Sequence, residues 1–336
     1  MRTSSRGTVD SLDASGTLAH GGDEKKLEVK PYRGQNPSPS PALMQSACQI
    51  LPRFLQLNLL VLLWSLTGIL GEYLSLEPAA LVFWRTAIAS GMFYFFCRLK
   101  EPHLLRISRK NLFTALIAGF LLGVHWLCFF GAIAVSNVSI GLAGFASTAL
   151  FTALLEPLIE KRRPNPSHLT LAAVVVLGIA LIGGAKTSVP NSVLGLSIAL
   201  VGAALAAAYS ILSKNLVVAA VPGPTMMAYQ IPAACLTSLL AILVIPAFDF
   251  QLPQSTDWIP LLILALACTF GAYLWFARLL KHLSAYTINL AINFEPVYGF
   301  LMAAALFHEH QALTPTFYLG AVVIVIANVL HSRQPQ

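Results

Sequence analysis

The sequence predicts an all-α polytopic membrane protein with ten transmembrane helices, arranged as two inverted five-helix repeats. Three observations support this fold class. Hydrophobic residues make up 57% of the 336 residues and charged residues only 10%, whereas an ordinary globular domain carries about 25% charged residues. The apolar residues form long runs with most charges between them. A stretch of the first half also recurs in the second half.

The first 52 residues differ from the rest. They are rich in Ser, Gly, Pro and mixed charge, as in PYRGQNPSPSPA. Such a segment cannot bury enough apolar surface to offset the entropy lost on ordering. We therefore predict a disordered cytoplasmic tail over 1–52, without a signal peptide. Either Met1 or Met44 is compatible with the start of translation.

The remainder of the chain is divided into apolar runs of membrane-spanning length. A helix needs roughly 20 apolar residues to cross a bilayer. Ten runs satisfy this requirement, at 54–72, 78–98, 112–134, 138–159, 168–185, 192–213, 225–246, 259–280, 284–306 and 315–332.

The basic residues between these runs lie on one side. With the N-terminus in the cytoplasm, the inner segments carry 13 Lys and Arg and the outer segments only Lys186. Positive residues accumulate in cytoplasmic loops, so we expect both termini to face the cytoplasm. This segregation also accounts for the net charge of +7. The expected partners are therefore the lipid bilayer and a small-molecule substrate, and not nucleic acid.

An internal repeat relates the two halves. GVHWLCFFGAIAVSNVSI (123–140) aligns without gaps on GAYLWFARLLKHLSAYTI (271–288), with Gly, Ser and Ile identical at three positions. The offset of 148 residues superposes the third run on the eighth and the fourth on the ninth. Because five spans per half is an odd number, the halves must have opposite orientations. Inverted repeats are typical of secondary transporters, which bind substrate where the halves meet.

Four motifs resemble the EamA family of the drug/metabolite transporter superfamily. They are WSLTGILGE (64–72), FWRTAIASG (83–91), VSNVSIGLAGF (135–145) and INFEPVYGFLMAAALFHEH (292–310). The resemblance covers roughly residues 53–331, and we place its two repeats at 53–185 and 192–332. The last motif resembles a bacterial branch, which implies a plasma (cell inner) membrane.

The resemblance implies alternating access around a central cavity lined mainly by spans 1, 3, 4, 6, 8 and 9. Most members of the family are exporters, which favours efflux of a small metabolite or drug-like solute. The chain contains no nucleotide-binding domain, so an ion gradient or the substrate gradient must drive transport. The substrate, the coupling ion and the oligomeric state are not specified by the sequence.

Two charges stand inside apolar runs. Glu295 lies eleven residues into its span, roughly 16 Å along the helix and hence near mid-membrane. Arg85 lies at a similar depth in the second span. Unpaired charges are costly in a bilayer, so we predict that the two residues pair or share a substrate, and that Glu295 contacts substrate or exchanges protons. A purely structural ion pair is the alternative. Pro296 cannot donate a backbone hydrogen bond, and we expect a kink there.

Polar residues follow one face of the ninth span. Tyr286, Asn289 and Asn293 follow one another at spacings of three and four residues and share a helix face. Glu295 lies about 200° around the helix from Asn293, so one face lines a cavity and the other packs on a neighbour. Asn289 and Asn293 are candidates for substrate or proton coupling, and Tyr286 for lining the cavity. Interhelical hydrogen bonding is the alternative role for the asparagines.

Further candidates for the cavity wall are aromatic or repeat-related. Trp64, His125, Trp126 and Tyr273 lie in the first, third and eighth spans, and packing against lipid or protein is the alternative for each. Ser147 occupies the position of Glu295 in the first repeat.

We expect neither enzymatic activity nor a cofactor or metal. The five cysteines show no CxxC pair or metal-ligand spacing, and no phosphate loop or nucleophile elbow is present. Two alternatives to transport remain. One is a non-transporting membrane receptor or scaffold, which only the tail favours. The other is an intramembrane enzyme, which would require a catalytic cluster at matched depth.

Overall fold

The computed structural model describes residues 41–100, 102–161, 163, 165–183, 189–292, 294–306 and 314–332. Contacts between Cα atoms divide the chain into two compact units, Met1–Ser46 and Ala47–Gln336. The second unit contains both repeats. The regular elements in the described ranges are all helices, with no strand among them.

Each predicted span contains a single helix or a row of helical segments. The uninterrupted helices are α1 (Pro41–Glu72), α2 (Pro78–Lys100), α3 (Arg109–Val135), α6 (Pro166–Gly183), α7 (Ser192–Val218), α8 (Gly223–Val244) and α13 (Pro315–Ser332). The segmented spans are α4 (Val138–Phe145) with α5 (Thr148–Glu160), α9 (Trp258–Ala265) with η2 (Leu266–Gly271) and α10 (Ala272–Leu279), and α11 (Ala285–Ile292) with α12 (Glu295–Leu306). A short 3₁₀ turn, η1 (Pro102–Leu105), follows α2.

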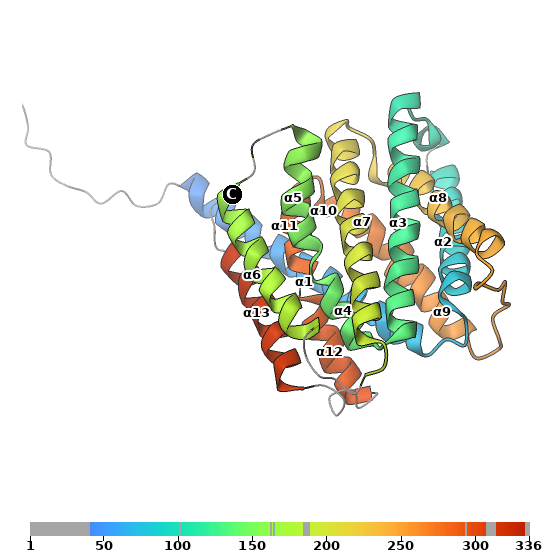
Figure 1. Ribbon diagram of the computed structural model, residues 1–336. Helices are drawn as coiled ribbons and strands as arrows, with labels where there is room; N and C mark the ends of the chain where they lie inside the picture. Colours follow the sequence, from blue (N-terminus) through green and yellow to red (C-terminus); the bar gives the residue numbers. More distant parts are fainter. Residues whose placement is uncertain are drawn as a thin grey trace, which may run out of the picture. The chain divides into compact units, whose positions relative to one another are not determined.

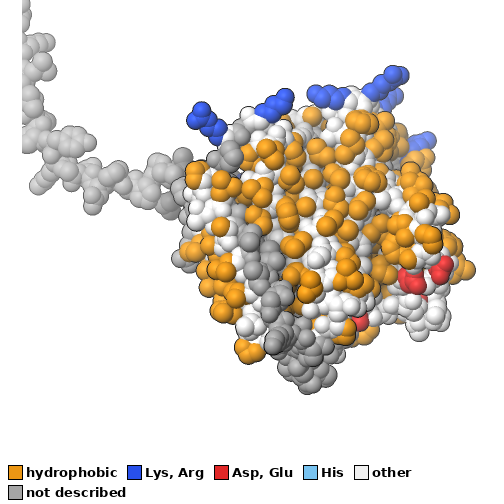
Figure 2. Space-filling view, in the orientation of Figure 1, with side chains coloured by type: hydrophobic (Ala, Val, Ile, Leu, Met, Phe, Trp, Pro, Cys, Tyr) orange, Lys and Arg blue, Asp and Glu red, His pale blue; other side chains and the backbone are white. Residues whose placement is uncertain are grey.

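Seven helical stretches in the described part of the chain are long and apolar enough to cross a membrane. They are Leu55–Glu72, Pro78–Lys100, Arg109–Val135, Val138–Glu160, Ser192–Val218, Gly223–Val244 and Trp258–Leu279. Their outward faces carry large exposed apolar side chains such as Phe113, Phe120 and Leu243. Figure 2 shows these as a broad hydrophobic band, with Lys and Arg gathered at one end of the molecule. The protein is therefore a polytopic helical membrane protein.

The predicted boundary of the N-terminal tail differs from the structure. The tail was expected to extend to residue 52, whereas α1 begins at Pro41. Residues 42–51, ALMQSACQIL, contain no Gly or Pro, and most of them are residues that a helix accommodates readily. The mixed Ser, Pro and Gly composition on which the prediction rested belongs to the residues before this stretch.

The helix contacts follow the internal repeat. Helix α2 packs on α8 and α6 packs on α13, and in each pair the two helices are repeat equivalents. The extensive contact of α3 with α7 has its counterpart between α10 and α1, where Trp64 lies 5.5 Å from Tyr273 and 5.7 Å from Phe276 between ring centroids. Figure 1 shows α3 beside α7 and α6 beside α13. The two halves are thus interleaved within one compact unit.

Glycines permit the close approach of α3 to α8. A Cβ atom at Gly119 would clash with the carbonyl oxygen of Gln230, and one at Gly123 would lie 3.0 Å from the Cα of Ala234. These neighbours are backbone atoms, which cannot rotate away. Small residues at such crossings let membrane helices pack by van der Waals contact, so GFLLG (119–123) fixes the separation of two helices from different repeats.

Substitution Gly119→Ala should destabilise the protein by about 1–3 kcal/mol, because the added methyl group overpacks the contact with Gln230. Gly91→Ala is the matched control, since a Cβ atom there meets nothing within 4 Å. The thermal unfolding midpoints of the purified proteins in detergent measure the difference. Equal midpoints for the two variants would show that the α3–α8 contact tolerates separation.

A hydrogen-bonded latch joins the two halves beyond the helix ends. Asp257, just before α9, accepts hydrogen bonds from the backbone N–H of Ser75 (2.9 Å), the Ser75 hydroxyl (2.7 Å) and the backbone N–H of Gln254 (2.8 Å). Gln251 accepts further bonds from the Glu77 N–H and from the Trp84 indole, both at 2.8 Å. The loop before α9 is therefore tied to the loop before α2.

The latch favours the ionised form of Asp257. Burial raises the pKa of this carboxyl, but the hydrogen bonds from Ser75 and Gln254 outweigh that effect and hold the pKa below its ordinary value of 3.8. A carboxyl with a lower pKa in the folded state stabilises the protein above its unfolded-state pKa of about 4. That contribution is lost as the pH falls through the folded-state pKa.

Asp257→Asn should lower the free energy of unfolding by about 1–2 kcal/mol at pH 7, because an amide NH₂ replaces one of the accepting oxygens. We expect the lower value of this range, because water near the loops screens the charge of Asp257. Thermal unfolding at pH 7 and at decreasing pH measures the effect, and the gap from native protein should narrow below about pH 4. The control is Asp249→Asn, an exposed carboxylate in the same loop. A gap that is independent of pH would contradict this role.

Candidate functional site

A cavity of about 60 Å³ lies among the helices of both repeats, with room for a few water molecules or a small ligand group. Its wall is formed by Trp64, Thr67, Arg85, Leu122, His125, Trp126, Phe129, Phe145, Thr148, Ala206, Tyr209, Ser210, Tyr273, Phe276, Asn289, Ile292 and Glu295. These residues come from spans 1, 3, 4, 6, 8 and 9, with Arg85 as the single contribution of span 2.

The cavity adjoins two helix breaks at equivalent positions of the repeats. Helix α4 ends at Phe145 and α5 begins at Thr148, while α11 ends at Ile292 and α12 begins at Glu295. With the offset of 148 residues, Ser147 superposes on Glu295 and Thr148 on Pro296. Discontinuous helices at the meeting of two repeats are a recurring feature of transporter binding sites.

The two breaks carry different chemistry. In the first repeat the Ser147 hydroxyl donates to the carbonyl of Gly144 and the Thr148 hydroxyl to that of Phe145, each at 2.7 Å. The Gly144 carbonyl also accepts the backbone N–H of Ser147 at 3.1 Å, so the two hydroxyls add to the hydrogen bonding of carbonyls at the end of α4. Ser147 is fully buried and does not contribute to the cavity wall, although it was predicted to line the cavity.

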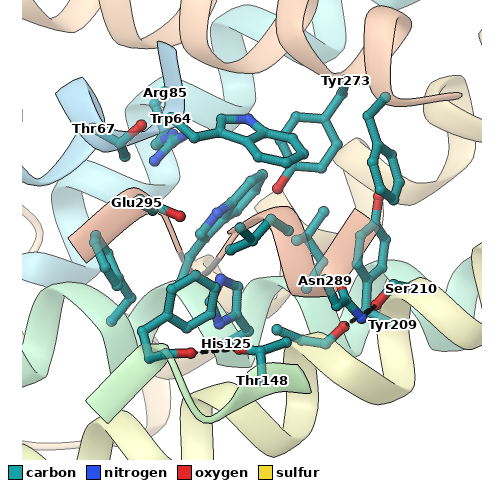
Figure 3. A pocket seen from close by; sticks show the side chains of 17 residues that line it. Trp64, Thr67, Arg85, His125, Thr148, Tyr209, Ser210, Tyr273, Asn289 and Glu295 are labelled. Atoms are coloured by element: carbon teal, nitrogen blue, oxygen red, sulfur yellow. Dashed lines mark hydrogen bonds between the residues drawn. The ribbon is translucent and has the colours of Figure 1, made fainter. Parts of the chain in front are cut away.

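In the second repeat a carboxylate occupies the break. Glu295 is 4% exposed and forms no hydrogen bond or ion pair with another described residue. Its carboxylate points into the cavity (Figure 3). Pro296 lies in the first turn of α12, where a missing N–H costs little. Phe294, directly before α12, is a turn residue, so the chain leaves the helix two residues before Pro296.

Arg85 is held by neutral groups. It is 1% exposed, and its Nε and Nη2 donate to the Thr269 hydroxyl at 3.2 and 2.8 Å. The guanidinium carbon lies 4.5 Å from the ring centroid of Trp126 and 5.6 Å from that of Phe130. Such cation–π contacts are worth up to about 2 kcal/mol where water is excluded. The remaining nitrogen, Nη1, has no hydrogen-bond partner.

Arg85 and Glu295, which were predicted to pair or to share a substrate, line the same cavity. Both side chains contribute to its wall, but no ion pair joins them in the described structure. Their similar positions along their spans place both in one cavity wall, whereas direct contact also depends on the direction of each side chain around its helix. The Arg85 guanidinium and the Glu295 carboxylate therefore face the same cavity without contacting each other.

A π-helix positions the partner of Arg85. Thr269 lies in η2 and donates its hydroxyl to the carbonyl of Leu264 at 2.7 Å while accepting from Arg85. The equivalent stretch of α3, residues 118–123, is regular α-helix. Single π-turns often occur at functional sites. The sequence contains no signal for this turn, so Thr269 was not among the predicted residues.

Several donors in the cavity wall lack a partner. The buried polar atoms without a hydrogen-bond partner in the described residues are Trp64 Nε1, Thr67 Oγ1, Arg85 Nη1, Tyr209 OH, Thr225 Oγ1 and Gln230 Oε1. The first four belong to the cavity wall. Buried polar groups usually have hydrogen-bond partners. The gathering of four unpartnered polar atoms in the cavity wall therefore marks the cavity as a candidate binding site. Thr67 follows Trp64 by three residues in α1, a spacing from which it could have been predicted.

The predicted aromatic residues lie together in the wall. Trp126 packs edge-on against Tyr273 at 5.5 Å between ring centroids. The ring of His125 stacks on Phe145 at 4.9 Å, and its Nδ1 lies 3.0 Å from the carbonyl oxygen of Gly202. Because a carbonyl only accepts, Nδ1 carries the hydrogen in this bond.

Asn289 both lines the cavity and joins helices. Its Nδ2 donates to the hydroxyls of Thr152 in α5 (2.8 Å) and Ser210 in α7 (2.7 Å). The interhelical role given as an alternative for this residue is therefore present in the structure. Tyr286 is buried outside the cavity wall, and Asn293 lies outside the described residues. Ser210 and Tyr209 in the wall were not predicted.

The architecture defines a polytopic helical membrane protein whose two repeats enclose a cavity beside broken helices. The model of the EamA-like transporter family matches the chain twice, over residues 54–184 and 193–333. These matches cover most of the sequence. The protein therefore belongs to the EamA-like transporter family, in the drug/metabolite transporter superfamily.

Comparison with solved structures gives the same fold. One structure, described as a crystal structure of a protein, has 19% sequence identity and a TM-score of 0.61 to this chain. The match covers 84% of this chain and 99% of the other. No curated protein matches the sequence.

Asn289→Ala should lower the free energy of unfolding by about 1 kcal/mol, because it removes bonds among α5, α7 and α11. Asn215→Ala in α7 is the control, since the Asn215 side chain is half-buried and makes no hydrogen bond to a described residue. Unfolding midpoints in detergent compare the two variants. A loss no larger than that of the control would rule out Asn289 as a stabilising link.

Proposed function

We propose that the protein is a secondary transporter that exports a small metabolite or drug-like solute by alternating access. The observation that carries this proposal is the cavity between the two repeats, where Glu295 and Arg85 both face the enclosed space without pairing. Charged groups inside a membrane protein are costly and usually serve substrate or ion pathways. Membership of the EamA-like transporter family supports the same conclusion.

The proposed topology has ten spans with both termini in the cytoplasm of the plasma (cell inner) membrane. The two repeats, 53–185 and 192–332, then have opposite orientations. Figure 2 supports this orientation, since Lys and Arg gather at one end of the visible face and Asp and Glu lie toward the other. The basic end corresponds to the cytoplasmic side by the positive-inside rule.

Glu295 is the proposed coupling residue. A carboxylate that is only 4% exposed and has no described partner is costly, and a bound proton or a substrate donor relieves that cost. When the cavity opens to water, hydration stabilises the charge instead. Exchange of a proton or substrate at Glu295 is thereby linked to opening and closing of the cavity, which is the requirement for coupled transport.

Glu295→Gln should abolish export or remove its dependence on pH, because the amide keeps the size of the side chain and cannot exchange a proton. The measurement compares metabolites in the growth medium of cells producing native or variant protein at equal membrane levels. Compounds that accumulate only with the native protein identify the substrate.

Glu72→Gln, at the end of α1 and away from the cavity wall, is the control and should export normally. Equal export by native protein and Glu295→Gln would leave transport in place and remove Glu295 from the coupling step. Reconstitution of the identified compound in liposomes should then give a flux that depends on the protein, and no flux would refute transport.

A further inference from the structure

We propose that Arg85, Trp64 and Thr67 form a subsite that binds the carboxylate group of the transported solute. This inference rests on the proposed function, because it assigns a substrate class to the same cavity. The three residues lie together on one side of the cavity in Figure 3. Each has a buried polar atom without a hydrogen-bond partner.

The three residues offer donors. Arg85 Nη1 and the Trp64 indole N–H can only donate, and the Thr67 hydroxyl can donate as well as accept. A purely structural arginine would be expected to have its N–H groups satisfied by protein acceptors. Here the Thr269 hydroxyl accepts from Nε and Nη2, while Nη1 has no hydrogen-bond partner in the described residues. The missing component is an acceptor.

The charge of Arg85 favours an anion, which enters the cavity when Glu295, in the same wall, carries a proton. Among the described residues no carboxylate lies within ion-pair distance of Arg85. Its stabilising neighbours are a hydroxyl and two aromatic rings, none of which neutralises its charge. A ligand carboxylate would supply both the negative charge and two oxygens that accept from Arg85 and from a neighbouring donor. Charge-assisted hydrogen bonds of this kind are among the strongest in proteins.

The wall of the cavity favours a carboxylate over a phosphate. The Trp126 ring covers the guanidinium at 4.5 Å, and Trp64 lies beside Arg85 in Figure 3. A planar carboxylate matches the planar guanidinium fork. A tetrahedral phosphate would bring additional charge and oxygens for which this side of the wall has few remaining donors.

The Arg85 side chain is also held in place by its contacts with Thr269 and Trp126. Thr269 is fixed by its bond to Leu264 within η2, and the face of Trp126 covers the guanidinium. Both contacts hold the side chain in one orientation before a ligand arrives. This arrangement reduces the entropy cost of binding, which fits a recognition site better than a mobile charge.

The test is binding of acetate and of acetamide to the purified full-length protein in lipid nanodiscs, at constant ionic strength. Acetate should raise the unfolding midpoint and change tryptophan emission in a saturable manner. Acetamide, which has the same shape without the charge, should do neither. Inorganic phosphate is the third probe and should bind at least about tenfold more weakly than acetate.

Variants separate the subsite from general effects on folding. Thr67→Val should weaken acetate binding about tenfold, the usual loss for one hydrogen bond to a charged group. Thr225→Val is the matched control, because Thr225 also has a buried hydroxyl without a partner and lies outside the cavity wall. Trp64→Phe should weaken binding while keeping an aromatic ring. Arg85→Gln should abolish acetate binding. If the Arg85→Gln protein does not fold, Thr67→Val and Trp64→Phe still test the subsite.

Equal binding of acetate and acetamide would overturn the proposal, as would preferential binding of phosphate. So would the same acetate affinity in Thr67→Val and Thr225→Val. Failure of this inference is distinguishable from failure of the transport function. Export of a solute without a carboxylate would refute the subsite alone, whereas acetate binding without any solute flux would refute transport alone.

Discussion

The burial of the Arg85 guanidinium without an acidic partner is the constraint on which the arrangement of the site depends. A charge at the centre of a bilayer costs on the order of 3 kcal/mol even on insertion scales. The protein offsets this cost with the Thr269 hydroxyl from η2 and the faces of Trp126 and Phe130 from α3. Helices α2, α3 and η2 must therefore meet around this one side chain. Because η2 follows α9 and belongs to the second repeat, the requirement also joins the two halves.

The interleaving of the repeats follows from the same need for close contact. Gly119 and Gly123 bring α3 against the backbone of α8, and α1 lies against α10 through Trp64, Tyr273 and Phe276. Each of these contacts joins one half to the other. Since the cavity wall draws on both repeats, any relative movement of the halves changes its shape. The hydrogen bonds from Ser75 to Asp257 connect the two halves at the helix ends. They oppose relative movement of the loops before α2 and α9.

The sequence predicted features that depend on composition and spacing. The seven membrane-length helical stretches of the described chain were visible because lipid demands long apolar runs, and Glu295 and Arg85 stood out because charges are rare within apolar runs. The break between α4 and α5 was not visible, since residues 138–159 form a continuous apolar run and the interruption depends on tertiary packing. Thr269 was missed for a related reason, because the π-turn that presents it has no composition of its own. The repeat alignment placed Ser147 at the helix break opposite Glu295. It could not predict that the Ser147 hydroxyl donates to the Gly144 carbonyl instead of lining the cavity.

The two repeats share a backbone plan and differ in the chemistry at its centre. Both break the helix at the same place, yet the first closes the break with the hydroxyls of Ser147 and Thr148, and the second places Glu295 and Pro296 there. Likewise, η2 has no counterpart in α3. A shared backbone plan would allow two halves to exchange conformations at similar energy, which the proposed alternating access requires. Selectivity needs a single set of recognition groups, and duplicated charges would repel each other in a cavity of about 60 Å³. The asymmetry of the side chains is what a single binding site between two related halves would require.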